Sequence, residues 1–381
     1  MRILDDVAER LRIGIVGCGD VAYRHYVPGL ATRAEDVAIA AVADPRPGAA
    51  GALARSVASW SPGTTAYASV NEMVSAELLD GVVNLTPAPA HAAVNRTILR
   101  AGIACYSEKP LASTVDDASA LIDLAAARAV LLLCAPGSAV SARVGWLRDL
   151  AASGRLGHPT LAVAHHADPG PAAWREYTGD PTPIYGDGVG PVFDHGVYRL
   201  HEMTAVLGPV RRVQGMGRIA IPRRRVRGGP FRGRTIEVTT PDHVLINLEF
   251  ASGALGQLLA SFGTPETLAP WLELHLTGGT VSFGGKSWEP DAPVSVYTDD
   301  DSDAAREAWA MDVDAPRDEL GVVELGVRHF VACLLGEEEP VLTAEHARHV
   351  LDVILAAYAS IADGASHEVG TTFAWARPAD G

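Results

Sequence analysis

RIGIVGCGDVA, residues 12–22, is the part of the sequence that says most about the fold. An apolar run leads directly into Gly17-Cys18-Gly19, and a segment with a helical period follows. Strand, glycine turn and helix in this order are the context in which the pattern G-x-G-x-x-A binds a dinucleotide. Gly17 makes the tight turn, Gly19 lets the backbone approach a pyrophosphate, and the small Ala22 lets helix and strand pack closely. We therefore expect the pyrophosphate at this helix N-terminus, beside Asp20 and Val21.

The second apolar run, Val37–Ala43, ends at Asp44, which lies 22 residues after Ala22. A carboxylate at the tip of the second strand can accept hydrogen bonds from both ribose hydroxyls of an adenosine. It also repels a 2′-phosphate, so the sequence predicts NAD as the cofactor. Arg46 could offset that repulsion, which leaves NADP possible. The alternative to a cofactor site is a purely structural glycine turn in another α/β protein.

Short apolar runs alternate with helix-like segments through the first 136 residues. Near-continuous apolar strands between helices are typical of a parallel sheet that is covered on both faces. Right-handed crossovers make such a sheet doubly wound. We therefore predict the α/β class, with an NAD(P)-binding Rossmann domain over residues 1–136. The further runs that support this domain are Gly81–Leu85, Ile103–Tyr106 and Val130–Ala135.

The alternation of apolar runs and helix-like segments ends after Pro136. The sequence beyond it contains Pro- and Gly-rich loops and runs rich in β-forming residues. Residues 243–250 and 254–262 flank a short turn that contains Gly253, which is a hairpin signal. A second hairpin is predicted around Gly278 and Gly279. We therefore expect residues 137–381 to form an α+β domain with an open, mostly antiparallel sheet. Helices are predicted over 139–153, around 197–207, and over 320–335 and 344–362.

Composition excludes several classes of protein. The 381 residues carry 46 acidic and 31 basic side chains, a net charge of −15, which disfavours nucleic-acid and anionic-membrane partners. The chain has no run of 18 apolar residues and no apolar leader near its N-terminus, so we expect a cytoplasmic protein without a membrane span. Its cysteines are predicted to be buried, reduced thiols in a reducing compartment: Cys18, Cys105, Cys134 and Cys333.

Two polar segments follow predicted strands of the first domain. Glu108-Lys109-Pro110 comes after Ile103–Tyr106, and the carboxyl end of a parallel strand is where ligands bind in such sheets. The Lys109 ammonium could polarise or protonate a substrate oxygen there. A solvated surface charge is the plain alternative for this lysine. Thr86 and Pro87 follow the strand 81–85, and His91 sits in the next helical turn as a cofactor contact or a partly exposed helix residue.

The second domain holds a further candidate for proton transfer. Asp194, Tyr198 and His201 are spaced i, i+4 and i+7, which places them on one face of a helix. A tyrosine that is oriented by an aspartate is a plausible proton donor. The alternative is an ordinary polar helix face.

No metal site is predicted. His201-Glu202 lacks the second histidine of HExxH because residue 205 is alanine, and His165 and His166 point to opposite faces of a strand. The arginines of residues 223–234 could bind an anion, although an exposed basic loop explains them as well.

Four blocks of the chain together resemble the glucose–fructose oxidoreductase/inositol dehydrogenase (Gfo/Idh/MocA) family. They are GIVGCGDVA, NLTPAPAH, AGIACYSEKPLA and GVGPVFDHGVYRLHEMTAVLGP, and the resemblance extends over roughly Arg12 to Phe373. It implies that Lys109 contacts nicotinamide and substrate, and that Asp194 and Tyr198 belong to the D-x-G-x-[HY] catalytic motif. Many members have histidine in place of Tyr198, so the chain resembles the tyrosine-containing subset. Many also have aspartate in place of His201, and an apolar residue in place of His195.

The resemblance implies an NAD(P)-dependent oxidoreductase that acts on a secondary hydroxyl or ketone of a sugar, sugar derivative or polyol. The second domain is then the substrate-binding and oligomerisation domain, and a homodimer or homotetramer is expected. Candidate substrate contacts, besides the catalytic residues, are Arg175 and Tyr185 in the loop 174–190. Glu108 joins Thr86, Pro87 and His91 among the expected cofactor contacts. Two other readings stay open: hydride recycling or glycoside cleavage on a tightly bound NAD, and a dinucleotide-sensing regulator without activity.

Overall fold

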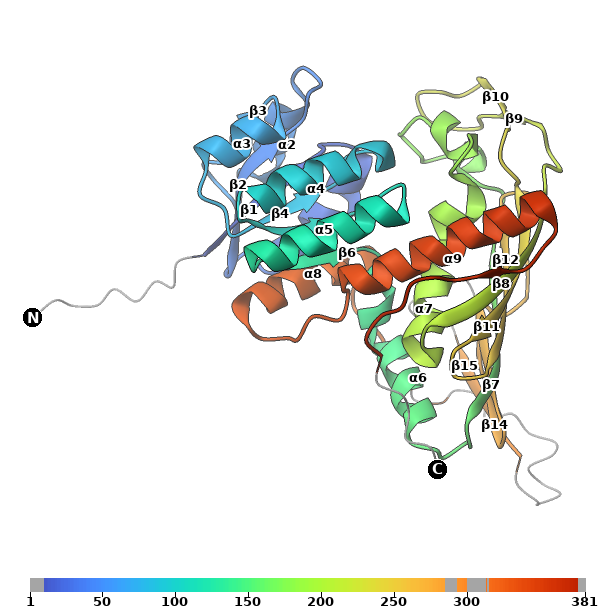
Figure 1. The fold of residues 1–381 in the computed structure, drawn as a ribbon. Coiled ribbons are helices and arrows are strands. Elements are labelled where there is room, and N and C mark those ends of the chain that lie inside the picture. The colour runs from blue at the N-terminus through green and yellow to red at the C-terminus, as the bar shows by residue number, and fades with distance from the viewer. Residues whose placement is uncertain (1–9, 285–292, 300–312, 314, 376–381) are drawn as a thin grey trace, which may run out of the picture. The chain divides into compact units, whose positions relative to one another are not determined.

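The chain forms two compact units in the computed structural model, which describes residues 10–284, 293–299, 313 and 315–375 (Figure 1). One unit comprises residues 1–137 and 322–348, and the other comprises residues 138–321 and 349–381. We expected two domains with a single boundary after residue 136, and the observed units differ from that expectation in one main respect. The segment 322–348, which we assigned to the second domain, belongs to the first unit.

The first unit has a six-stranded sheet in the order β3-β2-β1-β4-β5-β6, and all its strand pairs are parallel. This is the strand order of a dinucleotide-binding Rossmann fold, with its crevice where the order reverses between β1 and β4. The α/β prediction is confirmed. The strands are β1 (Leu11–Val16), β2 (Val37–Ala43), β3 (Thr65–Tyr67), β4 (Gly81–Asn84), β5 (Ala104–Ser107) and β6 (Leu132–Cys134).

Helices connect these strands, and two of them begin at residues whose side chains cap them. The Ser69 and Thr114 hydroxyls accept hydrogen bonds from the backbone N–H three residues on, which satisfies donors that a helix leaves open. The helical segments are η1 (Ala22–Tyr26, a π-helical turn), α1 (Val27–Ala31), α2 (Ala49–Val57), α3 (Val70–Ala76), α4 (His91–Arg100), α5 (Val115–Arg128) and α8 (Val322–Leu335).

Helix α8 joins the first unit because its apolar face packs on the sheet. Phe330 is fully buried, and its ring centroid lies 5.7 Å from that of Tyr106 on β5. A Cβ atom on Gly81 of β4 would lie 2.8 Å from the Phe330 ring. Only glycine leaves room for this ring, so β4 and α8 fit together although Gly81 and Phe330 are 249 positions apart in the chain.

The second unit has an eight-stranded sheet in the order β15-β14-β13-β7-β12-β11-β8-β16. Its pairs are antiparallel except β7 with β12, which confirms the predicted mostly antiparallel sheet. The strands are β7 (Pro159–Ala167), β8 (Val210–Arg218), β11 (His243–Phe250), β12 (Leu255–Ser261), β13 (Leu272–Leu276), β14 (Gly279–Phe283), β15 (Val294–Thr298) and β16 (His367–Glu368). Both predicted hairpins are present, as β11–β12 and β13–β14.

Helices cover one face of this sheet. They are α6 (Ala142–Ala152), the π-helical turn η6 (Val192–Gly196) with α7 (Val197–Leu207), and α9 (Ala344–Asp363), which begins in the first unit and continues into the second. Short 3-10 turns lie at Ala88–Ala90, Gly137–Val140, Pro171–Ala173 and Thr182–Tyr185. On the other face, Met216, Leu245 and Leu255 are exposed by 73%, 47% and 55%.

The structure bears only in part on the predictions about the cell compartment. No helix in the described part of the chain is long and apolar enough to cross a membrane. Residues 1–9, from which we expected no leader, lie outside the described residues. All four cysteines are free thiols, but Cys333 is partly exposed, which corrects the expectation that all four are buried.

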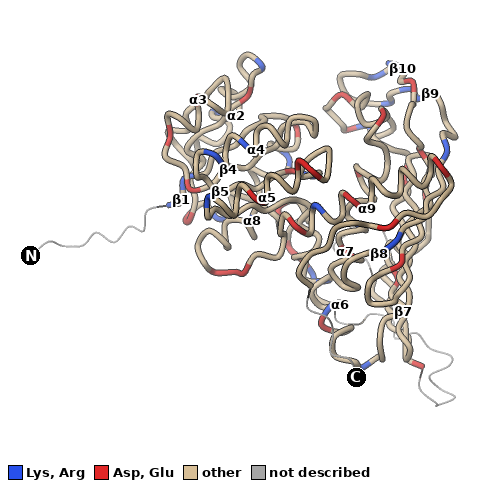
Figure 2. Tube along the Cα trace, viewed as in Figure 1, with Lys and Arg blue, Asp and Glu red and all other residues tan. Residues whose placement is uncertain are grey.

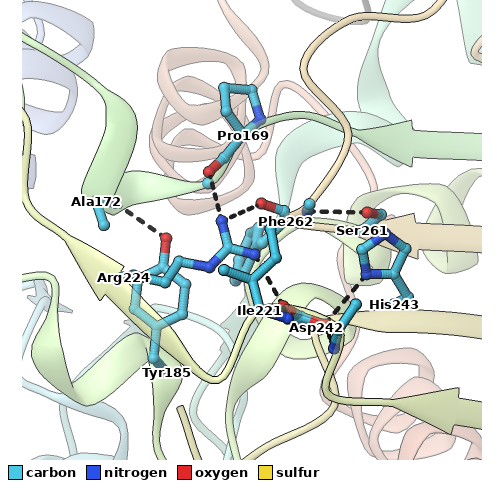
Figure 3. Close-up of polar contacts among 12 residues, drawn as sticks. Pro169, Ala172, Tyr185, Ile221, Arg224, Asp242, His243, Ser261 and Phe262 are labelled. Atoms are coloured by element: carbon cyan, nitrogen blue, oxygen red, sulfur yellow. Dashed lines mark hydrogen bonds and ion pairs between the residues drawn. The ribbon is translucent and has the colours of Figure 1, made fainter. Parts of the chain in front are cut away.

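A small two-stranded sheet of β9 (Arg223–Arg225) and β10 (Thr235–Glu237) also belongs to the second unit. A buried ion pair between Arg224 and Asp242 anchors it to the rest of that unit (Figure 3). Arg224 donates to the Asp242 carboxylate at 2.9 Å and to the carbonyl oxygens of Pro169 and Phe262. Asp242 is fully buried and also accepts hydrogen bonds from the backbone N–H groups of Ala220 and Ile221. The expected basic loop is thus only partly exposed, since Arg224 points into the unit.

This geometry predicts different effects for neighbouring arginines. Arg224→Met would leave the Asp242 carboxylate buried without its cation, which typically costs about 3–5 kcal/mol. Arg223→Met on the same strand is the matched control, because Arg223 is exposed and should change stability by less than ~0.5 kcal/mol. Urea unfolding of both variants measures the difference, and equal stabilities would contradict the anchoring role.

Candidate functional site

The glycine turn of the first unit has the geometry that a dinucleotide requires. Gly17 has a φ of +94°, and a Cβ there would lie 2.6 Å from the backbone carbonyl of Leu85. No atom lies within 4 Å of the corresponding position on Gly19, so the loop is open on that side. Ala22 is fully buried where η1 begins. A side-chain-free loop at a helix N-terminus fits a pyrophosphate.

Two other residues of the motif lie at its surface. The Asp20 carboxylate forms an ion pair with Arg24 at 3.1 Å, and Val21 is partly exposed. Neither side chain is needed for the turn itself, because the backbone makes it.

Asp44 lies at the end of β2, as predicted, and its side chain is almost fully buried. One carboxylate oxygen accepts a hydrogen bond from the Cys18 N–H at 2.8 Å, which ties β2 to the glycine turn. Arg46 binds both oxygens through its guanidinium, at 2.9 and 2.7 Å. Burial alone would raise the pKa of Asp44, but the hydrogen bonds from Arg46 and Cys18 outweigh it and lower that pKa. Asp44 is therefore an anion at neutral pH.

His91 lies inside the first unit, not at its surface. The ring is 1% exposed and lies between two carbonyl oxygens, 2.6 Å from that of Thr86 and 2.6 Å from that of Pro110. The reading of a partly exposed helix residue is therefore wrong. His91 links the loop at Thr86 and Pro87 to the loop after β5, and so it positions candidate cofactor contacts without facing the solvent itself.

Glu108 has a similar positioning role. Its carboxylate accepts hydrogen bonds from the Tyr26 hydroxyl at 2.7 Å and from the Lys109 N–H at 2.8 Å. One oxygen therefore holds the segment after β5 to η1, and the other fixes the backbone of that segment at Lys109. The next peptide bond, Lys109–Pro110, is cis. Lys109 is partly exposed at the carboxyl end of the parallel sheet, where the sequence placed it.

The candidate proton-transfer residues of the second unit lie where η6 becomes α7. Asp194 is in η6 and partly exposed, whereas Tyr198, in the first turn of α7, is 7% exposed. Gly196 lies between them, and a Cβ there would meet Leu258 and Ala260 of β12 at 3.3 Å. The glycine of the motif thus lets this helix start lie close to the sheet.

Two expectations for this unit need correction. His201 is buried, and burial, with His349 nearby, lowers its pKa to about 3, so its ring is neutral and donates no proton as an imidazolium. Tyr185 has no exposed surface, and its hydroxyl accepts a hydrogen bond from the Ala172 N–H (Figure 3). It belongs to the core and cannot contact a substrate. Arg175 is exposed, as a substrate contact would need.

Sequence reasoning missed a polar cluster beside Asp194. His166 at the end of β7, Asp168 after it, and His195 lie with their ligating atoms within 4.8 Å of one another. Burial lowers the pKa of His166 to about 3. Burial alone would raise the pKa of Asp168, but the two histidines beside it outweigh that effect and lower this pKa. The available signal was the i, i+2 spacing of His166 and Asp168, which puts them on one side of an extended strand.

Comparison with known proteins gives consistent matches in both units. The NAD-binding Rossmann-fold model of the Gfo/Idh/MocA oxidoreductase family matches residues 11–135, and that family's C-terminal domain model matches residues 144–282. The chain is 29% identical over 282 residues to the dTDP-3,4-didehydro-2,6-dideoxy-alpha-D-glucose 3-reductase of Streptomyces antibioticus, covering 70% of this chain and 81% of that enzyme. It is 26% identical to the 1,5-anhydro-D-fructose reductase of Ensifer adhaerens, over 94% and 99% of the two chains.

The same fold also occurs in a protein that is named as a repressor. The super-repressor mutant of Gal80p from Saccharomyces cerevisiae superposes with a TM-score of 0.77 at 18% identity, covering 95% of this chain and 98% of that one. At that identity the likeness shows the fold alone. The family membership is shown by other findings. Two domain models of one family match this chain in the expected order, and its relatives include proteins named as sugar reductases. This chain belongs to the Gfo/Idh/MocA family of oxidoreductases and carries its NAD-binding Rossmann domain.

Proposed function

We propose that the protein is an NAD-dependent oxidoreductase that interconverts a secondary hydroxyl and a ketone on a sugar, sugar derivative or polyol. The observation that carries the proposal is the presence of a proton-transfer group in each unit. Lys109 follows β5 at the carboxyl end of the parallel sheet, and Tyr198 lies one turn after Asp194. Relatives named as sugar reductases and inositol dehydrogenases support the substrate class.

NAD, when bound, supplies the nicotinamide carbon that accepts or donates the hydride. The chain's own residues handle the proton. Tyr198 would take it from the substrate hydroxyl on oxidation and return it on reduction. An ammonium beside a phenol favours the phenolate, so Lys109 would make Tyr198 a better proton acceptor. Asp194, in the turn before Tyr198, would orient the pair.

Two other functions make different predictions. A family member that keeps NAD bound and recycles the hydride would show turnover without releasing NADH. A regulator like the one named in the Gal80p structure would bind a dinucleotide without any turnover. The presence of Lys109 and of the Asp194–Tyr198 motif favours an enzyme. A screen of sugars and nucleotide sugars with NAD and NADP, followed by absorbance of the reduced cofactor, separates the three.

The first prediction concerns cofactor choice. We expect NADH to bind at least about tenfold more tightly than NADPH, or about 1.4 kcal/mol, because Asp44 repels a 2′-phosphate. The Arg46 guanidinium is already bound to Asp44 on both oxygens. Arg46→Ala should therefore leave NADH favoured. Fluorescence titration with both cofactors measures this, and tighter binding of NADPH would instead make Arg46 a phosphate ligand.

The second prediction concerns the catalytic pair. Tyr198→Phe should bind NADH normally and lose at least ~100-fold in turnover, since a general acid/base typically contributes 10²–10⁴-fold. Lys109→Met should lose a similar factor. The double variant should lose much less than the product of the two factors, because the groups act as one unit.

Tyr358→Phe is a matched control for that experiment. Tyr358 is also in the second unit, but its hydroxyl donates to the Val189 carbonyl at 3.0 Å. Its removal should change turnover by only a few-fold. If Tyr198→Phe keeps most of its activity while this control behaves normally, another group transfers the proton.

The third prediction concerns assembly. Met216 and Leu245 are paired across β8 and β11 on the sheet face that no helix of the described residues covers, and Leu255 lies on the same face. We expect this apolar face to be buried in a dimer or tetramer. Light scattering at micromolar concentration should show an oligomer for the natural chain and a smaller mass for Met216→Glu with Leu245→Glu. Leu268→Glu, at a fully exposed loop position, should leave the mass unchanged.

A further inference from the structure

Three residues from two segments of the second unit converge beside Asp194. His166 is the eighth residue of β7, Asp168 lies just beyond its end, and His195 is in η6. An Asp168 carboxylate oxygen lies 3.3 Å from His195 Nδ1 and 3.7 Å from His166 Nε2. The two imidazole rings face one another with centroids 4.1 Å apart.

These separations are close to those of a metal coordination shell. Zinc lies about 2.0–2.2 Å from imidazole nitrogen and carboxylate oxygen, so tetrahedral ligands are about 3.4 Å from one another. The two separations to Asp168, 3.3 and 3.7 Å, need shifts of only a few tenths of an ångström to match. All three ligating atoms lie within 4.8 Å of one another. Two imidazoles and one carboxylate also leave a position for water, as in open zinc sites.

The surroundings hold His195 in the orientation that such a site requires. Trp174 stacks on the His195 ring at 5.3 Å, and the Phe262 ring meets it edge-on at 5.5 Å. The other ring nitrogen, Nε2, lies 3.4 Å from the Asp194 carboxylate. A histidine that binds metal through one nitrogen typically donates from the other to a carboxylate. His195 fits this arrangement, because its Nδ1 points toward Asp168 and the proposed ion while its Nε2 points toward the Asp194 carboxylate.

We propose that His166, Asp168 and His195 bind one divalent transition-metal ion, for which zinc is the best match. The mixed nitrogen and oxygen donors select zinc and its neighbours over magnesium, which prefers oxygen ligands alone. The ion would fix the His195 ring and, through Nε2, the side chain of Asp194. That second consequence rests on the proposed role of Asp194, whereas the binding site itself does not.

The full, tag-free chain is first stripped of metal with a chelator, and zinc is then titrated into it while calorimetry measures binding. Elemental analysis of the dialysed protein gives the amount of zinc per chain. We expect one zinc per chain, and no measurable binding of magnesium. Asp168→Asn should keep the fold yet weaken zinc binding by about tenfold or more, because an amide is a poorer ligand than a carboxylate. His195→Ala should abolish stoichiometric binding.

His165→Ala is the matched control. His165 is adjacent to His166, but it lies on the opposite face of β7 and its Nδ1 is 2.9 Å from the Pro270 carbonyl oxygen. This variant should bind zinc like the natural chain. Zinc should also raise the melting temperature of the natural chain and of His165→Ala, but not that of His195→Ala.

Two results would overturn the proposal. One is the absence of stoichiometric zinc in the natural chain, and the other is equal binding by the natural chain and Asp168→Asn, which would mean adventitious binding elsewhere. NAD-dependent turnover is measured separately, with and without chelator. A chain that turns over substrate but binds no zinc disproves the metal site alone, and a chain that binds zinc without turnover disproves the proposed reaction alone.

Discussion

At Gly17 the backbone leaves β1 so close to Leu85 that no side chain fits between the two segments. This close approach fixes the end of β1 against the end of β4, at the place where the strand order reverses. The elements of the candidate cofactor site are built outward from it. Asp44 is held by the N–H of Cys18, the residue after Gly17, and Thr86 follows Leu85. The His91 ring contacts the carbonyl oxygens of both Thr86 and Pro110, and so it links this part of the site to the segment that contains Lys109.

The sequence predicted well wherever structure depends on neighbours in the chain. The glycine motif after a buried strand, the carboxylate at the end of the next strand and the hairpin around Gly253 are local patterns, and each was found at its expected place. Packing between distant segments was not readable. Helix α8 joins the first unit because Phe330 fits over Gly81, and no pattern within either segment indicates that contact.

The same limit applies to single side chains. Tyr185 and His91 stand in polar, Pro-rich segments that favour exposure, yet long-range packing buries both. The cluster of His166, Asp168 and His195 depends on β7 lying beside η6, which the sequence could not place. Arg224 shows the opposite case, because it forms an ion pair with the buried Asp242 while Arg223 and Arg225 beside it are exposed. Figure 2 shows several basic positions around β9 and β10, and the colour of a position does not tell which of them is buried.

Two helices that begin at candidate site residues start with a π-helical turn, at Ala22–Tyr26 and at Val192–Gly196. Such a turn contains one residue more than an α-helix needs over the same length. Deleting that residue would close the wide turn into a regular helix and shift the side chains inside the turn relative to those after it. Asp194 lies inside the second turn, so its position relative to Tyr198 would change. In the evolution of this chain, these two short segments are therefore constrained in length as much as in composition, and substitutions there should be tolerated more readily than insertions or deletions.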